Sequence, residues 1–475
     1  MIIVILATSL AGCSKLADTP ILFGTLFSLK SVGYQGKEYF IDGTAHSYLP
    51  VGELTSDGQW IAEENEQADF ATRIVVYRPI NPADFNGTVV VEWINVSGNT
   101  DAPAEWNFAH TEFTRQGYAW VGVSAQRKGI DNVGNVGLLD GVLNASLKAL
   151  NPFRYNRLVH PGDSFSYSMF HQIARQIRYP DEQDFLEGLQ IERMIGAGDS
   201  QSAARLITYI NLLGKTEGLF DGFFVHSRFG SSAPVSEAPQ PVALPPAIVQ
   251  VREDLYKPVM MLQTETDLFV ASFLPGTAYE NRQPDTDFFR LWEVAGTAHA
   301  GAYTILGLFD AGSSSYYAEL ISQRYAVPLI VPCASPVNAN PAHHFVMNAA
   351  YRALDNWIRD GVAPSIADRL TVEGEPPQFA VDEFGNVRGG IRSPYVDAPL
   401  ARFAGIGEGS IMCMIFGTME KFSPAQLAAM YPIRDDYLDR VMQSLDQALE
   451  QQFLLPEDAE KIWQASQQMA RQIPQ

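Results

Sequence analysis

Long hydrophobic runs, clustered basic residues and cysteines are scarce in this chain of 475 residues, and each absence excludes a class of protein. No internal segment has the roughly 20 consecutive apolar residues that a membrane-spanning helix needs. No Lys/Arg-rich run appears and the formal net charge is −21, so nucleic acid is not expected as a partner. With 46% hydrophobic and 18% charged residues, the composition is that of a globular protein.

The first of only three cysteines, Cys13, follows a short apolar segment at the N-terminus. Leu10-Ala11-Gly12-Cys13 resembles the lipobox of bacterial lipoproteins, in which the cysteine is acylated and becomes the mature N-terminus. This resemblance implies a signal segment over residues 1–13 and an exported protein held to a membrane by lipid on its periplasmic side. Ser14 then favours the outer membrane.

The two remaining cysteines, Cys333 and Cys413, are expected to form a disulfide if the chain is exported. Two separate buried thiols are the alternative. Neither cysteine has the spacing of a metal site, and no His-Glu-x-x-His or comparable constellation occurs. We therefore expect neither a metal nor an organic cofactor.

Apolar runs alternate with amphipathic segments along the first three hundred residues, which predicts an α/β fold with a mainly parallel sheet. We expect one domain over 14–475, with a core over about 33–303 and a C-terminal elaboration over 304–475. The expected strands are 37–41, 71–77, 88–94, 118–123, 189–196, 220–226, 257–263 and 288–294, the first two as an antiparallel pair. The expected helices are 105–116, 164–177, 342–358, 435–453 and 457–472, with a hairpin over 379–391.

Two segments interrupt this alternation, 126–159 and the proline-rich 227–256. Both are long for loops in a compact domain, and such loops often form lids. We expect them to act as lid-like insertions or pocket walls, with surface decoration as the alternative.

The most informative motif is Gly198-Asp199-Ser200-Gln201-Ser202, where an apolar run meets a helical pattern. This is the strand–turn–helix setting of a nucleophile elbow, which presents a serine hydroxyl above the end of a sheet. The flanking residues must be small because strand and helix approach closely there. Ser202 replaces the usual last glycine but remains small. An ordinary strand-to-helix loop is the alternative.

An acid and a histidine follow in the order that α/β-hydrolases use. Asp267 lies shortly after the strand at 257–263, and Glu265 is the alternative acid. His299 follows the strand at 288–294 and is the candidate base. His226, which ends another strand, is expected to line the pocket.

The oxyanion that forms during acyl transfer needs two backbone N–H donors. Gln201 is expected to supply one, at the start of the helix after the serine. The other is expected from Val96 or Ser97, after the strand at 88–94; a plain turn is the alternative there.

The chain resembles the large bacterial α/β-hydrolase-domain proteins, from about Gly33 to about Tyr437. The resemblance rests on the serine motif, on Thr264-Glu265-Thr266-Asp267, on Ala295–His299 and on the segment Gly389–Pro399. It implies an α/β-hydrolase core, with helices on both faces of the sheet, and a C-terminal elaboration. It also makes Arg392 and Tyr395 candidate pocket residues, although an ordered loop is equally compatible.

These motifs together predict a serine hydrolase that cleaves carboxylic esters through Ser200, His299 and Asp267. The expected partners are a small or lipid-like ester substrate and, through the lipid, a membrane. An acyltransferase would use the same residues, and nothing marks the peptide pocket that a peptidase needs. A non-catalytic binding protein on a hydrolase scaffold is the remaining alternative.

Overall fold

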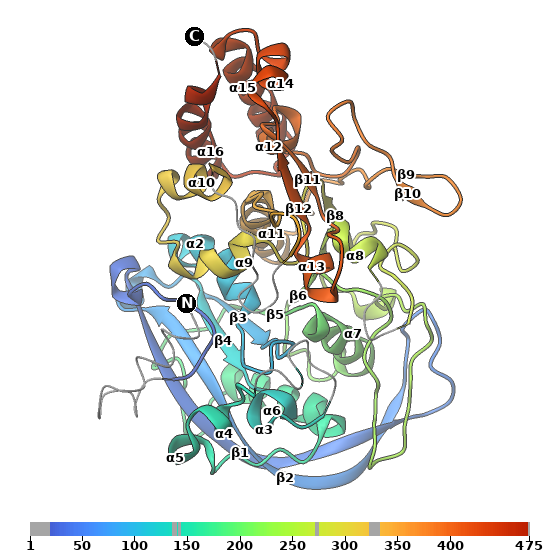
Figure 1. The fold of residues 1–475 in the computed structure, drawn as a ribbon. Helices are drawn as coiled ribbons and strands as arrows, with labels where there is room; N and C mark the ends of the chain where they lie inside the picture. Colours follow the sequence, from blue (N-terminus) through green and yellow to red (C-terminus); the bar gives the residue numbers. More distant parts are fainter. Residues whose placement is uncertain (1–19, 135–139, 141–143, 271–274, 323–332, 474–475) are drawn as a thin grey trace. The chain divides into compact units, whose positions relative to one another are not determined.

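The computed structural model describes residues 20–134, 140, 144–270, 275–322 and 333–473, so Cys13 lies outside the described residues. Eight strands form a mostly parallel sheet in the order β1-β2-β4-β3-β5-β6-β7-β8, accompanied by helices (Figure 1). The predicted α/β class with a mainly parallel sheet is confirmed. The strands are β1 Tyr34–Pro50, β2 Ala62–Pro79, β3 Thr88–Trp93, β4 Ala119–Val123, β5 Arg193–Asp199, β6 Gly222–His226, β7 Val259–Thr264 and β8 Phe289–Val294.

The internal contacts divide the chain into two units, 1–259 with 271–283 and 260–270 with 284–475. The sequence places the end of the core near residue 303, whereas the second unit begins at 260. The difference has a local cause, because loops that follow the last two strands bond to C-terminal segments. Ala295, directly after β8, donates its N–H to Ile391 O at 3.0 Å, and Gly405 N donates to Glu265 Oε2 at 2.7 Å.

In the first unit, β1 and β2 form the predicted antiparallel pair, but both are much longer than predicted. The first half of β2 is largely exposed and polar, so it lacks the apolar alternation that marks a strand. β3, β5 and β6 pair in parallel, and every residue in them is buried. Burial on both faces explains the apolar runs within them, such as Val89–Val91 of β3 and Phe223–Val225 of β6.

Helices cover both faces of the sheet in this unit: α2 Ala104–Gln116, α6 Ser166–Arg178 and α7 Gln201–Leu213. Successive side chains of a strand point to opposite faces. Trp93 of β3 packs 4.9 Å from the Phe170 ring of α6, while the adjacent Glu92 accepts the Glu105 N–H of α2 at 3.1 Å. α2 and α6 therefore lie on opposite faces. Tyr209 of α7 contacts Phe170, which places α7 beside α6.

The described residues of the insertion at 126–159 form three short helices, α3 Arg127–Asp131, α4 Leu147–Leu150 and α5 Pro152–Tyr155. Ile130, Leu147, Tyr155 and Leu158 form an apolar cluster of its own. The Tyr155 hydroxyl also accepts a hydrogen bond from buried Arg73 of β2 at 3.1 Å. The described residues of this insertion are therefore packed against the sheet.

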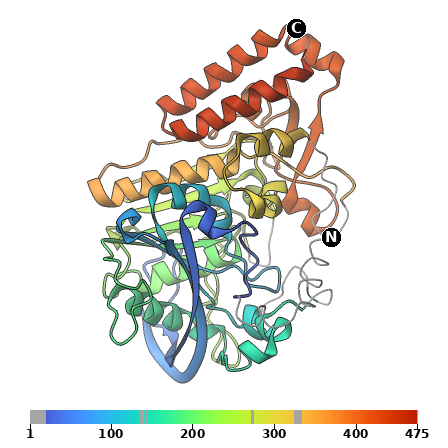
Figure 2. The same cartoon turned by 90° about the vertical axis from the view of Figure 1, so that its left-hand side faces the viewer.

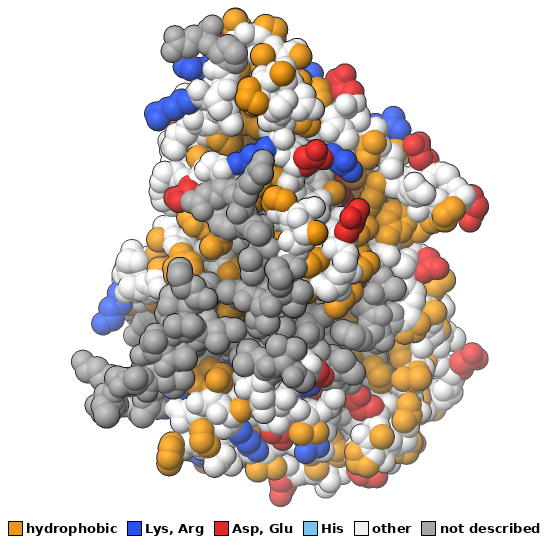
Figure 3. Space-filling model, in the orientation of Figure 1, with side chains coloured by type: hydrophobic (Ala, Val, Ile, Leu, Met, Phe, Trp, Pro, Cys, Tyr) orange, Lys and Arg blue, Asp and Glu red, His pale blue; other side chains and the backbone are white. Residues whose placement is uncertain are grey.

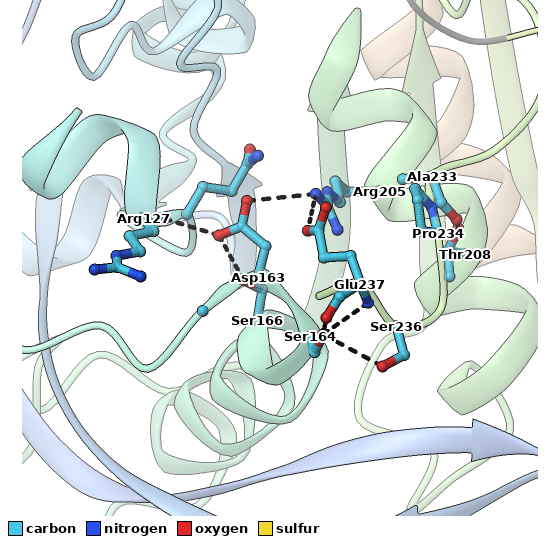
Figure 4. A network of polar contacts seen from close by, with 12 residues as sticks. Arg127, Asp163, Ser164, Ser166, Arg205, Thr208, Ala233, Pro234, Ser236 and Glu237 are labelled. Carbon is cyan, nitrogen blue, oxygen red and sulfur yellow. Dashed lines mark hydrogen bonds and ion pairs between the residues drawn. The ribbon is translucent and has the colours of Figure 1, made fainter. Parts of the chain in front are cut away.

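Hydrogen bonds and an ion pair join the second insertion, 227–256, to the helix that follows Ser200 (Figure 4). Arg205 of α7 donates to Glu237 Oε1 at 2.9 Å and to Asp163 Oδ2 at 3.3 Å. The hydroxyl of Ser164 accepts the Glu237 N–H at 2.9 Å. Because Arg205 is buried, these charge-assisted bonds are worth more than a surface pair. The roles of both insertions as lids or pocket walls stay a prediction.

The second unit holds β7, β8 and the C-terminal elaboration, and α15 and α16 lie side by side in it (Figure 2). The predicted helices at 342–358, 435–453 and 457–472 are present as α11, α15 and α16. The further elements are α8 Glu265–Phe269, α9 Ala302–Leu306, α10 Ser314–Ser322, α11 Ala342–Asp360, β9 Val372–Glu373, β10 Gln378–Phe379, α12 Pro394–Asp397, β11 Ala401–Ala404, α13 Ile411–Phe416, β12 Thr418–Lys421, α14 Pro424–Met430, α15 Arg434–Glu450 and α16 Pro456–Met469.

Smaller predictions in this unit can also be compared with the structure. Val381 and Val387 pair in antiparallel fashion around a turn at Gly385, as expected for the hairpin. A disulfide joins Cys333 to Cys413 of α13, with an S–S length of 2.04 Å.

The distribution of basic side chains on the surface agrees with the absence of a Lys/Arg-rich run in the sequence. On the face in Figure 3, Lys and Arg side chains are scattered rather than gathered into one patch. Within the described ranges, no helix combines the length and the hydropathy needed to cross a bilayer.

Candidate active site

The serine motif forms a sharp turn between β5 and α7. Ser200 has φ 58° and ψ −120°, a backbone conformation that non-glycine residues rarely adopt and that costs about 1–3 kcal/mol. Its N–H donates to His226 O of β6 at 2.9 Å, which holds the turn against the neighbouring strand. This is the strand–turn–helix geometry that the sequence predicts for a nucleophile elbow.

Steric crowding explains the small residues on either side of Ser200. A Cβ added to Gly198 would lie 2.9 Å from the carbonyl oxygen of Ser202, closer than such atoms approach. The Ser202 hydroxyl donates to Ile94 O at 3.2 Å. Ser202 thus keeps the elbow compact and also ties the start of α7 to the end of β3.

The candidate oxyanion donors lie on two segments of this first unit. Gln201 begins α7, so its N–H has no partner inside the helix. The Ser97 N–H donates to Asn95 Oδ1 at 2.8 Å and is therefore engaged. Val96 remains as the candidate from this loop. Asn95 Nδ2 in turn donates to Asp199 O at 3.1 Å, which links the loop to the elbow.

Beneath the elbow lies a buried polar cluster that the sequence reading did not anticipate. His226 is fully buried rather than lining a pocket, which corrects that expectation. Its Nδ1 lies 3.3 Å from both Glu105 Oε1 and Asp199 Oδ1. Burial, followed by the charge of Glu105, raises the pKa of neighbouring Glu92 well above its usual range. The acidic residue Glu92, inside an otherwise apolar strand, was the signal that could have revealed this cluster.

The predicted acid and base meet in the second unit. His299 Nδ1 lies 2.7 Å from Asp267 Oδ1, and both side chains are buried. The other carboxylate oxygen of Asp267 accepts the Thr264 N–H at 2.7 Å and the Thr264 hydroxyl at 2.9 Å. Because an ionised carboxylate only accepts, Nδ1 carries the proton and Nε2 of His299 is left as an acceptor.

Glu265 makes different contacts from Asp267. Its two oxygens accept the N–H groups of Gly296 at 2.5 Å and Gly405 at 2.7 Å. Gly296 belongs to the loop that carries His299. The structure therefore places Asp267 against the histidine and Glu265 against the backbone that supports the histidine loop.

The Gly389–Pro399 segment also lies beside this loop. Ala295 N donates to Ile391 O at 3.0 Å, and a Cβ on Gly296 would lie 2.4 Å from Val396 Cγ1. Tyr395 is buried, while Arg392 is partly exposed at a cavity. Among the described residues, no group of His, Cys, Asp and Glu could hold a metal ion.

A strained serine between strand and helix, and a histidine held by an aspartate, are the parts that define serine hydrolases of the α/β type. Ser200 belongs to the first unit, and Asp267 and His299 to the second. Their joint action stays a prediction. The alpha/beta hydrolase domain family model matches residues 10–464, and the chain belongs to this family.

Comparison with curated proteins finds no match. Among solved structures, a provisionally named dienelactone hydrolase from Klebsiella pneumoniae is similar with 12% identity and a TM-score of 0.29, covering 57% of this chain and 92% of that one. A serine hydrolase without a lid from Xanthomonas campestris shares 11% identity, with a TM-score of 0.28 and coverages of 54% and 86%. Fungal esterases from Rhizomucor miehei share 12%, with a TM-score of 0.23 and coverages of 55% and 78%.

Glu265 should make stability depend on pH. Burial, only partly offset by the two N–H bonds, raises its pKa from 4.5 to about 7. The folded protein therefore holds this proton more tightly than the unfolded chain does. The stability from the neutral carboxyl is present below about pH 4.5 and is lost as the pH rises toward about 7.

Between about pH 5 and about pH 8, the free energy of unfolding should fall by about 2–3 kcal/mol more in wild type than in the Glu265→Gln variant. Urea denaturation at both pH values measures the difference. Glu383→Gln, at an exposed turn position, serves as the control and should follow wild type. Equal losses in wild type and Glu265→Gln would contradict the prediction.

Proposed function

We propose that the protein is a serine hydrolase that cleaves carboxylic esters through Ser200, His299 and Asp267. The observation that carries the proposal is the positive φ of Ser200 at the junction of β5 and α7. An ordinary loop avoids the free-energy cost of such a backbone conformation. A non-glycine residue that keeps it is therefore expected where the side-chain hydroxyl must face a substrate. The hydrogen bond between His299 and Asp267 supplies the second part, a base with a defined tautomer.

The proposed reaction follows from the properties of these groups. The Ser200 hydroxyl attacks the ester carbonyl and transfers its proton to Nε2 of His299. Asp267 stabilises the imidazolium that forms, because its carboxylate accepts the Nδ1 proton. The Gln201 and Val96 N–H groups stabilise the oxyanion. His299 then protonates the leaving alcohol, and water hydrolyses the acyl-enzyme with the same histidine as base.

Replacing the nucleophile tests the proposal directly. We expect a fluorophosphonate probe to label wild type but not Ser200→Ala, and hydrolysis of p-nitrophenyl esters to fall by about 10⁴-fold or more. Ser202→Ala is the matched control, two residues away in the same turn. It loses only the bond to Ile94 O and should keep its labelling.

Labelling that persists in Ser200→Ala would show that another residue is the nucleophile. Absence of labelling in wild type would favour a non-catalytic binding protein. Labelling with ester turnover only in the presence of an alcohol acceptor would identify an acyltransferase. Short and long acyl chains, compared by kcat/KM, would define the acyl preference.

The acid is tested by two amide substitutions. We expect Asp267→Asn to lower kcat by about 10⁴-fold, because Nδ1 of His299 then loses its acceptor and the tautomer changes. Glu265→Gln should retain far more activity, since it does not touch the histidine. Steady-state kinetics at a pH where each variant is folded compare the two. The reverse order would make Glu265 the acid.

We further propose that the protein is exported and anchored to the periplasmic side of a membrane through lipid on Cys13. The support is the Leu10–Cys13 motif. Expressed in a bacterium fed radiolabelled palmitate, wild type should incorporate label and Cys13→Ala should not. Cys413→Ala is the control and should keep the label. Equal labelling of wild type and Cys13→Ala would refute the anchor.

A further inference from the structure

A cavity of about 520 Å³ opens in the C-terminal elaboration, and none of the residues proposed for catalysis lines it. One wall is the α15 face, and the other comes from residues 366–368 and 389–397. Its volume lies within the range of about 300–1,000 Å³ that small-molecule sites occupy. The cavity is therefore large enough for a small organic ligand.

Amide side chains dominate the α15 wall. Gln443, Gln447 and Gln451 recur every four residues, so they share one helix face. Each amide offers two N–H donors and a carbonyl acceptor. Across the described ranges, none of these three side chains has a hydrogen-bond partner. The wall thus presents a row of groups that can both donate and accept.

On the opposite wall, hydrogen bonds hold the charged side chains in place, and the charge of Arg392 is balanced by carboxylates. Arg392 donates to Asp397 at 2.6 Å and to Asp382 at 2.8 Å, and also to the carbonyl of Val387. Ser444 of α15 donates to the other oxygen of Asp397 at 2.7 Å. These bonds fix the guanidinium and the carboxylate before any ligand arrives, which lowers the entropic cost of binding.

The cavity carries balanced charge. Two arginines, Arg392 and Arg440, and two aspartates, Asp368 and Asp397, line it. Arg440 lies over the Phe384 ring, 5.4 Å from its centroid. Because aspartates and arginines are equal in number, the lining offers no excess of positive charge to an anion. Phe453 and Ile366 add a small apolar area.

We propose that this cavity binds a neutral, polyhydroxylated ligand: a sugar ring or a short oligosaccharide. A sugar hydroxyl both donates and accepts, which matches the amide row, the fixed guanidinium and the carboxylate oxygens. The C–H faces of a sugar ring match the apolar contribution of Phe453 and Ile366. The site does not depend on the proposed ester hydrolysis.

Calorimetric titration of Ser200→Ala protein with cellobiose, maltose and xylobiose tests the proposal without turnover. We expect at least one disaccharide to bind with millimolar Kd. Adding Gln443→Ala and Gln447→Ala should weaken that binding by roughly tenfold or more. Gln467→Ala is the matched control, an exposed glutamine of α16 that does not line the cavity, and should bind as the parent does.

Because both replaced glutamines are exposed, the double variant should melt with its parent, which a thermal scan verifies. No heat of binding with any of the three disaccharides would overturn the proposal. Binding that the double variant leaves unchanged, or that inorganic phosphate displaces, would also overturn it. Fluorophosphonate labelling is scored separately, so failure of either proposal leaves the other standing.

Discussion

At the junction of β5 and α7, Ser200 occupies a backbone conformation that costs about 1–3 kcal/mol and persists only where neighbours enforce it. Three contacts do so: Ser200 N with His226 O, Ser202 Oγ with Ile94 O, and Asn95 Nδ2 with Asp199 O. They come from the ends of β6 and β3 and from the loop after β3. The strained turn therefore requires the parallel sheet, because only parallel strands bring these carboxyl ends to one edge.

Buried acids lie near the serine turn and near the histidine loop, and each has a partner that offsets part of the cost of leaving water. In the first unit, Glu105 and Asp199 flank His226. In the second, Asp267 accepts three hydrogen bonds and Glu265 accepts two backbone N–H groups. In the second unit, the hydrogen bonds of Asp267 and Glu265 resist rearrangement, so they hold the histidine loop in one geometry.

Local patterns in the sequence were enough to predict the continuous apolar strands and the turn around Ser200. These features follow from burial and from close backbone approach, both of which local sequence records. The polar first half of β2 was missed because its exposed residues carry no alternation. The burial of His226 was missed because its partners, Glu105 and Asp199, are 121 and 27 residues away along the chain. Such pairing depends on tertiary structure, so no local sequence pattern indicates it.

The sequence treats the residues after about 303 as an addition to a finished core, but the contacts of the histidine loop indicate otherwise. Ala295 N bonds to Ile391 O, Ala300 N to Ile415 O and Ala302 N to Asn338 O. Gly405 supplies an N–H to Glu265 and accepts the Thr266 hydroxyl.

Without these segments, the N–H groups of Ala295, Ala300 and Ala302 would lose their acceptors, and Glu265 would be left with one unmatched oxygen. An unsatisfied buried group costs about 1–3 kcal/mol, more when charged. The contact between His299 and Asp267 thus needs the C-terminal elaboration to keep a single geometry. A truncation near residue 303 would remove that support even though it keeps Ser200, Asp267 and His299 in the chain.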